Sequence, residues 1–89
     1  MATVFIRHQV KDFGAWKQAY DAFRPRQQAL GVQGDAVYQA AADPNDVTVT
    51  HSFASLEAAE RFMGNDELRQ TMSTAGVAGE PTVWFTNEA

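Results

Sequence analysis

The sequence predicts an α+β protein of the ferredoxin-like class, in which two strand-helix-strand units share one four-stranded antiparallel sheet. Two observations carry this prediction. A strand-then-helix pattern occurs twice along the chain, and turn chemistry joins the two units as a hairpin. The repeat has one constant offset, with these members in each copy: Val4, Ile6, His8, Val10, Asp12 and Phe13, then Val47, Val49, His51, Phe53, Ser55 and Leu56.

Composition favours a single globular domain over residues 1–89, because 45% of the residues are hydrophobic and 20% are charged. A domain this short buries only about 60 to 65% of its unfolded surface. With no cysteine available for a disulfide, self-association is the stabilising device that we expect. The net charge of -4 argues against a nucleic-acid partner. No segment resembles a signal peptide or a membrane span, so we expect no membrane partner and a cytoplasmic location.

The first unit is predicted to be a strand over residues 3–10 followed by a helix with Asp12 as its N-cap. Pro25 lacks an amide donor and disfavours helical geometry at the preceding residue, so the helix should kink or stop near residue 23. A further turn over residues 27–30 would end at Gly31. The predicted apolar face of the helix consists of Phe13, Trp16, Ala19, Tyr20 and Phe23.

The middle of the chain is predicted to be a hairpin. Strands are expected over residues 34–41 and 47–53, joined by a turn at Asp43-Pro44-Asn45-Asp46. The two aspartates could suggest calcium, but the turn explains them better.

The second unit begins its helix at Ser55 and is interrupted at Gly64-Asn65-Asp66. Asp66 is expected to cap another short helix that ends near Gly76. A loop over residues 77–81 and a last strand over residues 82–86 complete the chain. The inward-facing positions of these two helices are Leu56, Ala59, Phe62, Met63, Leu68 and Met72.

Both strands of the repeat carry a histidine in the apolar phase, where another aliphatic residue would be ordinary. In the ferredoxin-like sheet these strands are central, antiparallel neighbours, so His8 and His51 should both face the helices. Directly opposed residues would have Cβ atoms about 5 Å apart, and a diagonal pair about 7 to 8 Å. We therefore expect both rings to line one cavity between sheet and helices.

The opposite face of the sheet combines polar residues with two aromatic ones, Phe5 and Trp84. An exposed aromatic patch on a small domain is typical of an interface. We expect a second copy to cover this face in a two-fold homodimer, whose two sheets form an eight-stranded α/β barrel. Arg7 lies on the same face, where an interchain hydrogen bond is a more ordinary role than anion binding.

Three segments resemble a bacterial family of small dimeric α/β-barrel proteins related to the antibiotic-biosynthesis monooxygenase superfamily and often labelled cyclase-like. The segments are HQVKDFGAWKQAYD, DPNDVTVTHSF and FMGNDELRQTMSTAGVAGEPTVWF. The resemblance covers most of the chain and concerns mainly caps, turns and packing positions. It implies the fold and the dimer. In the wider superfamily, cofactor-independent oxygenases and polyketide cyclases use pockets between sheet and helices.

For His8 and His51 two interpretations remain open. Each ring is either a buried, hydrogen-bonded core residue, or a catalytic group that removes a proton from a phenolic or enolic substrate. Trp16 and Tyr20 lie four residues apart on one helix face, and either form core or stack on a flat ligand, with the Tyr hydroxyl fixing its orientation. Phe62 and Met72 are the other candidate ligand contacts.

The two histidines lack a third ligand at a telling spacing, so we predict no metal site, and no motif indicates a cofactor. Three classes of function remain. The first is a cofactor-independent monooxygenase or a cyclase-like enzyme acting on an aromatic or polyketide-like molecule. The second is a non-catalytic ligand-binding protein. The third is a structural or regulatory homodimer whose pocket is filled by Phe23, Phe62 and Met72.

Overall fold

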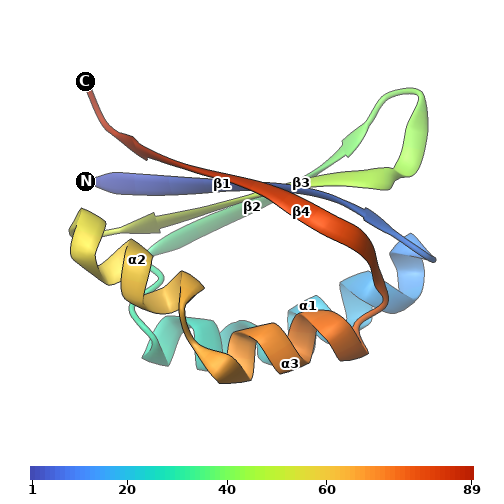
Figure 1. Ribbon diagram of the computed structural model, residues 1–89, viewed down its shortest axis with the longest axis horizontal. Helices are drawn as coiled ribbons and strands as arrows, with labels where there is room; N and C mark the ends of the chain where they lie inside the picture. Colours follow the sequence, from blue (N-terminus) through green and yellow to red (C-terminus); the bar gives the residue numbers. More distant parts are fainter.

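The computed structural model describes residues 1–89 as an antiparallel sheet with all helices on one of its faces (Figure 1). The strand order is β2-β3-β1-β4, and every neighbouring pair is antiparallel. The predicted ferredoxin-like fold class is confirmed, with the two strands of the repeat in the centre. The elements are β1 (Ala2–Val10), α1 (Phe13–Ala29), β2 (Gly34–Ala40), β3 (Asp43–Phe53), α2 (Leu56–Met63), α3 (Asp66–Thr74) and β4 (Val77–Asn87).

The helix starts follow the predicted capping chemistry. An Asp12 carboxylate oxygen accepts from the Ala15 amide at 2.9 Å, and the Ser55 hydroxyl accepts from Ala58 at 3.2 Å. Helix α3 differs by one residue, because its N-cap is Asn65 rather than Asp66. Each cap satisfies an amide that the first helical turn leaves without a partner.

Pro25 does not stop helix α1, so that prediction was wrong. The helix continues to Ala29 with Pro25 inside it. Pro25 lies on the exposed side of the helix, where water can hydrate the carbonyl that has lost its amide partner. As a result Gln27 remains helical and lies on the buried stripe of α1 together with Trp16 and Tyr20.

The hairpin turn lies at Ala41 and Ala42, two residues earlier than predicted, because Ala40 already pairs with Asp43. The residues predicted as the turn belong to β3. Their side chains stabilise the local backbone: Asp43 accepts from the Asn45 amide at 3.0 Å, and the Asn45 side chain accepts from the Phe13 amide at 3.0 Å. This end of the hairpin is thereby tied to the start of α1.

Residues 77–81 form the beginning of β4 and not a loop, so this prediction was also wrong. Val77 and Ala78 pair with Val10 and Gln9, after a register shift in the pairing with β1. Gly79 has a φ of 75°, which a glycine adopts without strain. Pro81 is tolerated because β4 is an edge strand.

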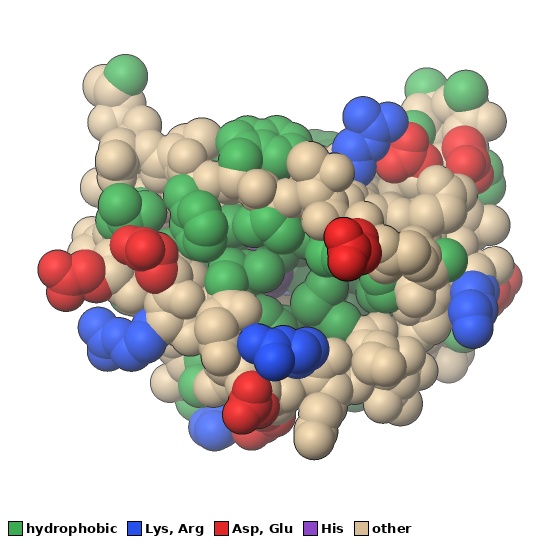
Figure 2. Space-filling model, in the orientation of Figure 1, with side chains coloured by type: hydrophobic (Ala, Val, Ile, Leu, Met, Phe, Trp, Pro, Cys, Tyr) green, Lys and Arg blue, Asp and Glu red, His purple; other side chains and the backbone are tan.

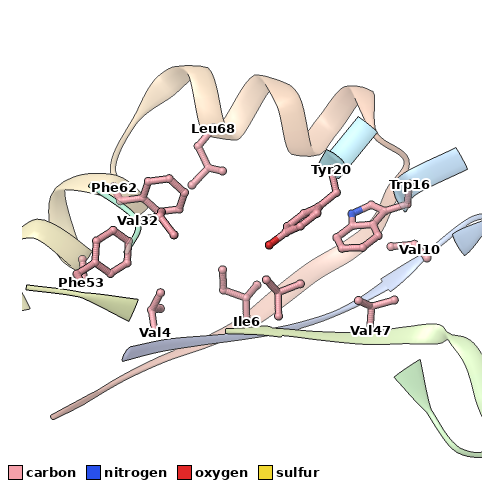
Figure 3. Packing of buried hydrophobic residues seen from close by; sticks show 12 residues of the cluster. Val4, Ile6, Val10, Trp16, Tyr20, Val32, Val47, Phe53, Phe62 and Leu68 are labelled. Carbon is pink, nitrogen blue, oxygen red and sulfur yellow. The ribbon is translucent and has the colours of Figure 1, made fainter. Parts of the chain in front are cut away.

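The core lies between the sheet and the helices (Figure 3). Val4 and Val47 from the central strands are fully buried, as are Phe53 at the end of β3 and, almost completely, Phe62 of α2. Figure 3 shows Trp16 and Tyr20 above Ile6 and Val47, with Phe62 and Leu68 at the other end. None of the helices is both long and apolar enough to span a membrane.

Candidate functional site

His8 and His51 both face the helices, but the register separates them more than predicted. His8 pairs with Val47, and His51 pairs with Val4, so neither a direct nor a diagonal contact exists between them. The predicted spacings of 5 Å and 7 to 8 Å were therefore wrong. Four residues of strand separate the two positions, which is roughly 13 Å along the sheet. The pair Ile6 and Val49 lies between them.

Aromatic rings of α1 bridge this gap. The Trp16 ring meets the His8 ring edge-on at 5.5 Å between centroids, and it stacks on Tyr20 at 5.1 Å. The Tyr20 ring in turn stacks on His51 at 6.1 Å, and the tilted Phe62 ring also contacts His51, at 5.2 Å between centroids. The two imidazoles thus do not contact each other, and a row of ring contacts through Trp16 and Tyr20 joins them.

A small cavity of about 40 Å³ lies between the sheet and this aromatic row. Five of the six predicted site residues line it, and Phe62 does not. The cavity has room for a hydroxyl group or a few water-sized groups, and is far smaller than the 300 to 1,000 Å³ of ordinary ligand pockets. Its lining consists of Ile6, His8, Trp16, Tyr20, Gln27, Val49, His51, Leu68 and Met72.

Three polar side chains in this lining have a buried atom without a hydrogen-bond partner. The atoms are Nδ1 of His8, Nδ1 of His51 and Oε1 of Gln27. The residues are only 5%, 2% and 3% exposed, respectively. Buried polar atoms are nearly always paired in proteins, so these three atoms call for a polar partner inside the cavity, supplied by ordered water or by a ligand.

Gln27 was not predicted as a site residue, although the sequence carries a signal for it. It follows Tyr20 by seven residues, so it falls in the same apolar phase of the helix as Trp16 and Tyr20. Like each histidine, it is a polar residue at a position where the pattern calls for an apolar one. The expected break at Pro25 obscured this phase.

Burial keeps both imidazoles neutral. Desolvation lowers the pKa of His51 to about 4, and the carboxylate of Asp35 offsets this only in part. Desolvation also lowers the pKa of His8. Since the change is large at His51, His8 is the stronger base of the two and is the better group to accept a proton near neutral pH.

The Tyr20 hydroxyl does not act as a base for a substrate, because it is already hydrogen-bonded within the protein. It donates a hydrogen bond to Asp35 on β2, and Arg24 completes the cluster with an Nη2–Oδ2 distance of 3.2 Å to the same carboxylate. Burial, followed by the bond to Asp35, raises the pKa of Tyr20. The phenol therefore stays protonated, and its hydroxyl hydrogen is held by Asp35.

A larger groove of about 460 Å³ opens beside the cavity, between α3 and β4. Leu68 and Met72 line both spaces and so form the boundary between them. Figure 2 shows this region as a hollow lined by hydrophobic side chains, with a histidine visible at its bottom. The rim also carries Arg69 and Glu80. The groove and the cavity are thus neighbours, with these two side chains between them.

Fold and site together define a single-sheet α+β protein with a small, mostly apolar cavity beneath its helices, into which three polar side chains are placed. The structure contains no group of three His, Cys, Asp or Glu side chains arranged to hold a metal ion. The chain matches no known family model, and no curated protein matches it.

Solved structures do match, and several of them are antibiotic biosynthesis monooxygenases, in line with the resemblance in sequence, while others are proteins of unknown function. One is an antibiotic biosynthesis monooxygenase with a TM-score of 0.79 and 11% identity, over 100% of this chain and 99% of the other. A second is a monooxygenase from the gene ActVA-Orf6 of Streptomyces coelicolor, in complex with nanaomycin D, with a TM-score of 0.72, 18% identity, and 99% and 87% coverage. A third, SnoaB from Streptomyces nogalater, is a cofactor-independent oxygenase, with a TM-score of 0.70, 14% identity, and 99% and 94% coverage. At these identities the likeness is one of fold.

Proposed function

We propose that this protein binds a small aromatic or enolic molecule at the histidine cavity and oxidises or cyclises it without a cofactor. The observation that carries the proposal is the group of three unpaired polar atoms, from His8, His51 and Gln27, around one cavity. The shared fold with a monooxygenase bound to nanaomycin D and with a cofactor-independent oxygenase supports it.

In the proposed reaction His8 is the catalytic base. Neutral imidazole accepts the proton of a phenol or enol and leaves an electron-rich carbanion equivalent. This carbanion gives its electrons to dioxygen, and a carbon–oxygen bond forms. For a phenol the balance is phenol plus O₂ to quinone plus water, so one oxygen atom stays on the ring carbon. The hydroxyl proton and the ring hydrogen leave with the other oxygen as water.

His51 has a different role in this proposal. Because its pKa is about 4, it is neutral throughout the physiological range. A neutral imidazole donates or accepts one hydrogen bond and can orient the substrate oxygen without competing for the proton. Trp16 and Tyr20 present their rings to the cavity and form its aromatic wall.

The size of the cavity places the substrate ring outside it. An aromatic ring does not fit in about 40 Å³, whereas the adjoining groove of about 460 Å³ accommodates one. The ring therefore lies in the groove, and a hydroxyl substituent reaches the cavity between Leu68 and Met72. Methionine is flexible and yields readily to such an insertion.

We also propose that the protein is a homodimer through the face of the sheet opposite the helices. Phe5 and Trp84 stack there at 5.3 Å between ring centroids, and Trp84 remains 43% exposed. Tyr38, which is 58% exposed, lies on the same face. Arg7 forms its ion pair within the chain, with an Nη2–Oδ2 distance of 2.6 Å to Asp46. The aromatic patch is then the main candidate interface.

Oxygen uptake with a panel of phenols and enols of one to three rings, including 1-naphthol, tests the enzymatic proposal. We expect uptake above the protein-free rate, 1,4-naphthoquinone as the product of 1-naphthol, and a loss of about a hundredfold or more in His8→Phe. Gln28→Met, at an exposed position, is the control. No uptake with any compound, or full activity in His8→Phe, would contradict the proposal.

The alternative is a protein that binds ligand without turnover, and the tight packing around the cavity favours it. The same panel separates the two functions, since a binding protein gives calorimetric or NMR signals on addition of ligand and returns the compound unchanged.

A further inference from the structure

We propose that Gln27 is a ligand-binding residue that selects an uncharged hydroxyl group over a carboxylate. This inference rests on the proposed ligand site and names the chemistry that the site recognises. Gln27 is 3% exposed, lines the histidine cavity, and leaves its Oε1 atom without a partner.

A structural role does not account for this side chain. A buried amide that stabilises a fold does so through hydrogen bonds, and an unpaired amide oxygen is a cost to the folded state. The backbone of Gln27 already serves the end of α1, where its carbonyl accepts from Leu30 and Val32 at 3.1 Å each. These two hydrogen bonds involve only the backbone, so any residue at this position could make them. An amide kept at such a position is best explained by a partner that arrives with the ligand.

The unpaired groups define the ligand chemistry. Oε1 of Gln27 accepts a hydrogen bond, and each neutral imidazole can accept one as well. A neutral imidazole also carries one N–H donor. A hydroxyl group fits this set, because it donates its one hydrogen to Oε1 of Gln27 on binding, gives that hydrogen to His8 when the reaction begins, and accepts from an imidazole N–H. The cavity holds no cation, because both imidazoles are neutral and the nearby Arg24 is bound to Asp35. A carboxylate would therefore be buried without a counter-charge, which is strongly unfavourable.

The test compares three probes of similar size, 1-naphthol, naphthalene and 1-naphthoate, on the wild-type protein and on Gln27→Met. Methionine keeps the length of the side chain and removes the amide. Isothermal titration calorimetry gives the affinities, and thermal unfolding without ligand gives the stability. Gln28→Met is the matched control, since Gln28 is the adjacent glutamine and is exposed.

We expect the wild type to bind 1-naphthol more tightly than naphthalene and to bind 1-naphthoate least. In Gln27→Met the affinity for 1-naphthol should fall about threefold to tenfold and that for naphthalene should not. The midpoint of thermal unfolding of Gln27→Met should rise by about 4 °C or more, because a buried unpaired oxygen is gone. Gln28→Met should change neither quantity.

The opposite results are equally distinct. If 1-naphthol binds both proteins alike, or if Gln27→Met unfolds at a lower temperature, Gln27 is not the ligand contact, while the proposed site itself stands. If the wild type binds 1-naphthoate best, the stated selectivity is wrong. If no probe binds the wild type, this inference and the proposed ligand site both fail. Binding of 1-naphthol without oxygen uptake contradicts only the proposed reaction.

Discussion

Replacing His51 by Phe should remove a large part of the pH dependence of stability between pH 6.5 and pH 4, and leave the part that belongs to His8. In the folded protein His51 has a pKa of about 4, against 6.5 for an ordinary histidine. Between these values the unfolded chain binds a proton that the folded protein does not. The free energy of unfolding therefore falls as the pH decreases from 6.5 to 4. Above pH 6.5, His51 adds no pH dependence to it.

The size of the effect follows from the two values. A difference of about 2.5 in pKa corresponds to about 3 kcal/mol, at about 1.4 kcal/mol for each unit. Such a loss is large beside the 5 to 15 kcal/mol of a typical domain. Phe at this position has no proton to bind, and it forfeits no hydrogen bond of Nδ1, because that atom has no partner. The variant should be about as stable as the wild type at pH 7.5.

Urea unfolding at several pH values between 7.5 and 4 measures this. The difference between the wild type and the variant isolates the contribution of His51 from that of other titrating groups. Asp46 is one of these, since its hydrogen bond with Arg7 lowers its pKa, and its contribution to the free energy of unfolding is lost only at lower pH. If the variant keeps the full slope between pH 6.5 and pH 4, or if the wild type shows none, the reasoning about a buried neutral imidazole is refuted.

Two further predictions concern the cluster around Asp35 and the proposed dimer face. Asp35→Ala removes the acceptor of the Tyr20 hydroxyl and the partner of Arg24, so the free energy of unfolding should fall by about 1 to 3 kcal/mol in urea unfolding. Asp21→Ala removes exposed ion pairs, with Lys17 at 2.7 Å and with Arg24 at 3.6 Å, and should change it by only about 0.5 kcal/mol or less, so equal losses would contradict the assignment. Trp84→Ser should convert the proposed dimer to a monomer of 9.8 kDa in analytical ultracentrifugation. A wild-type protein that already sediments as a monomer would contradict the proposed dimer.

The sequence predicted the architecture because that depends on periodic patterns and local chemistry. Alternation along the two repeated strands identified the helix-facing side, and Asp12 and Ser55 marked where helices begin. The placement of both histidines on the covered face followed from the same alternation. These features need only the residues within one element.

Features that depend on how elements meet were less predictable. The offset of His8 from His51 is set by the register in which β1 pairs with β3. A register shift of two residues leaves every side chain on the same face of the sheet, so the alternation of apolar residues does not determine it. The extension of β4 through Gly79 and Pro81 depends on its position at the edge of the sheet. Gln27 was missed because a local rule about Pro25 was applied where the exposed side of a helix tolerates proline.

The most direct test of the central claim, that His8, His51 and Gln27 enclose a ligand site, is an NMR pH titration of both imidazole rings from pH 4 to 9, with and without 1-naphthol. We expect His8 to titrate below pH 6.5 and His51 lower still, near pH 4, and both rings to shift when 1-naphthol is added. Rings that titrate near pH 6.5, or that do not respond to this or any other phenol of the panel, would contradict the claim and leave both histidines as ordinary residues.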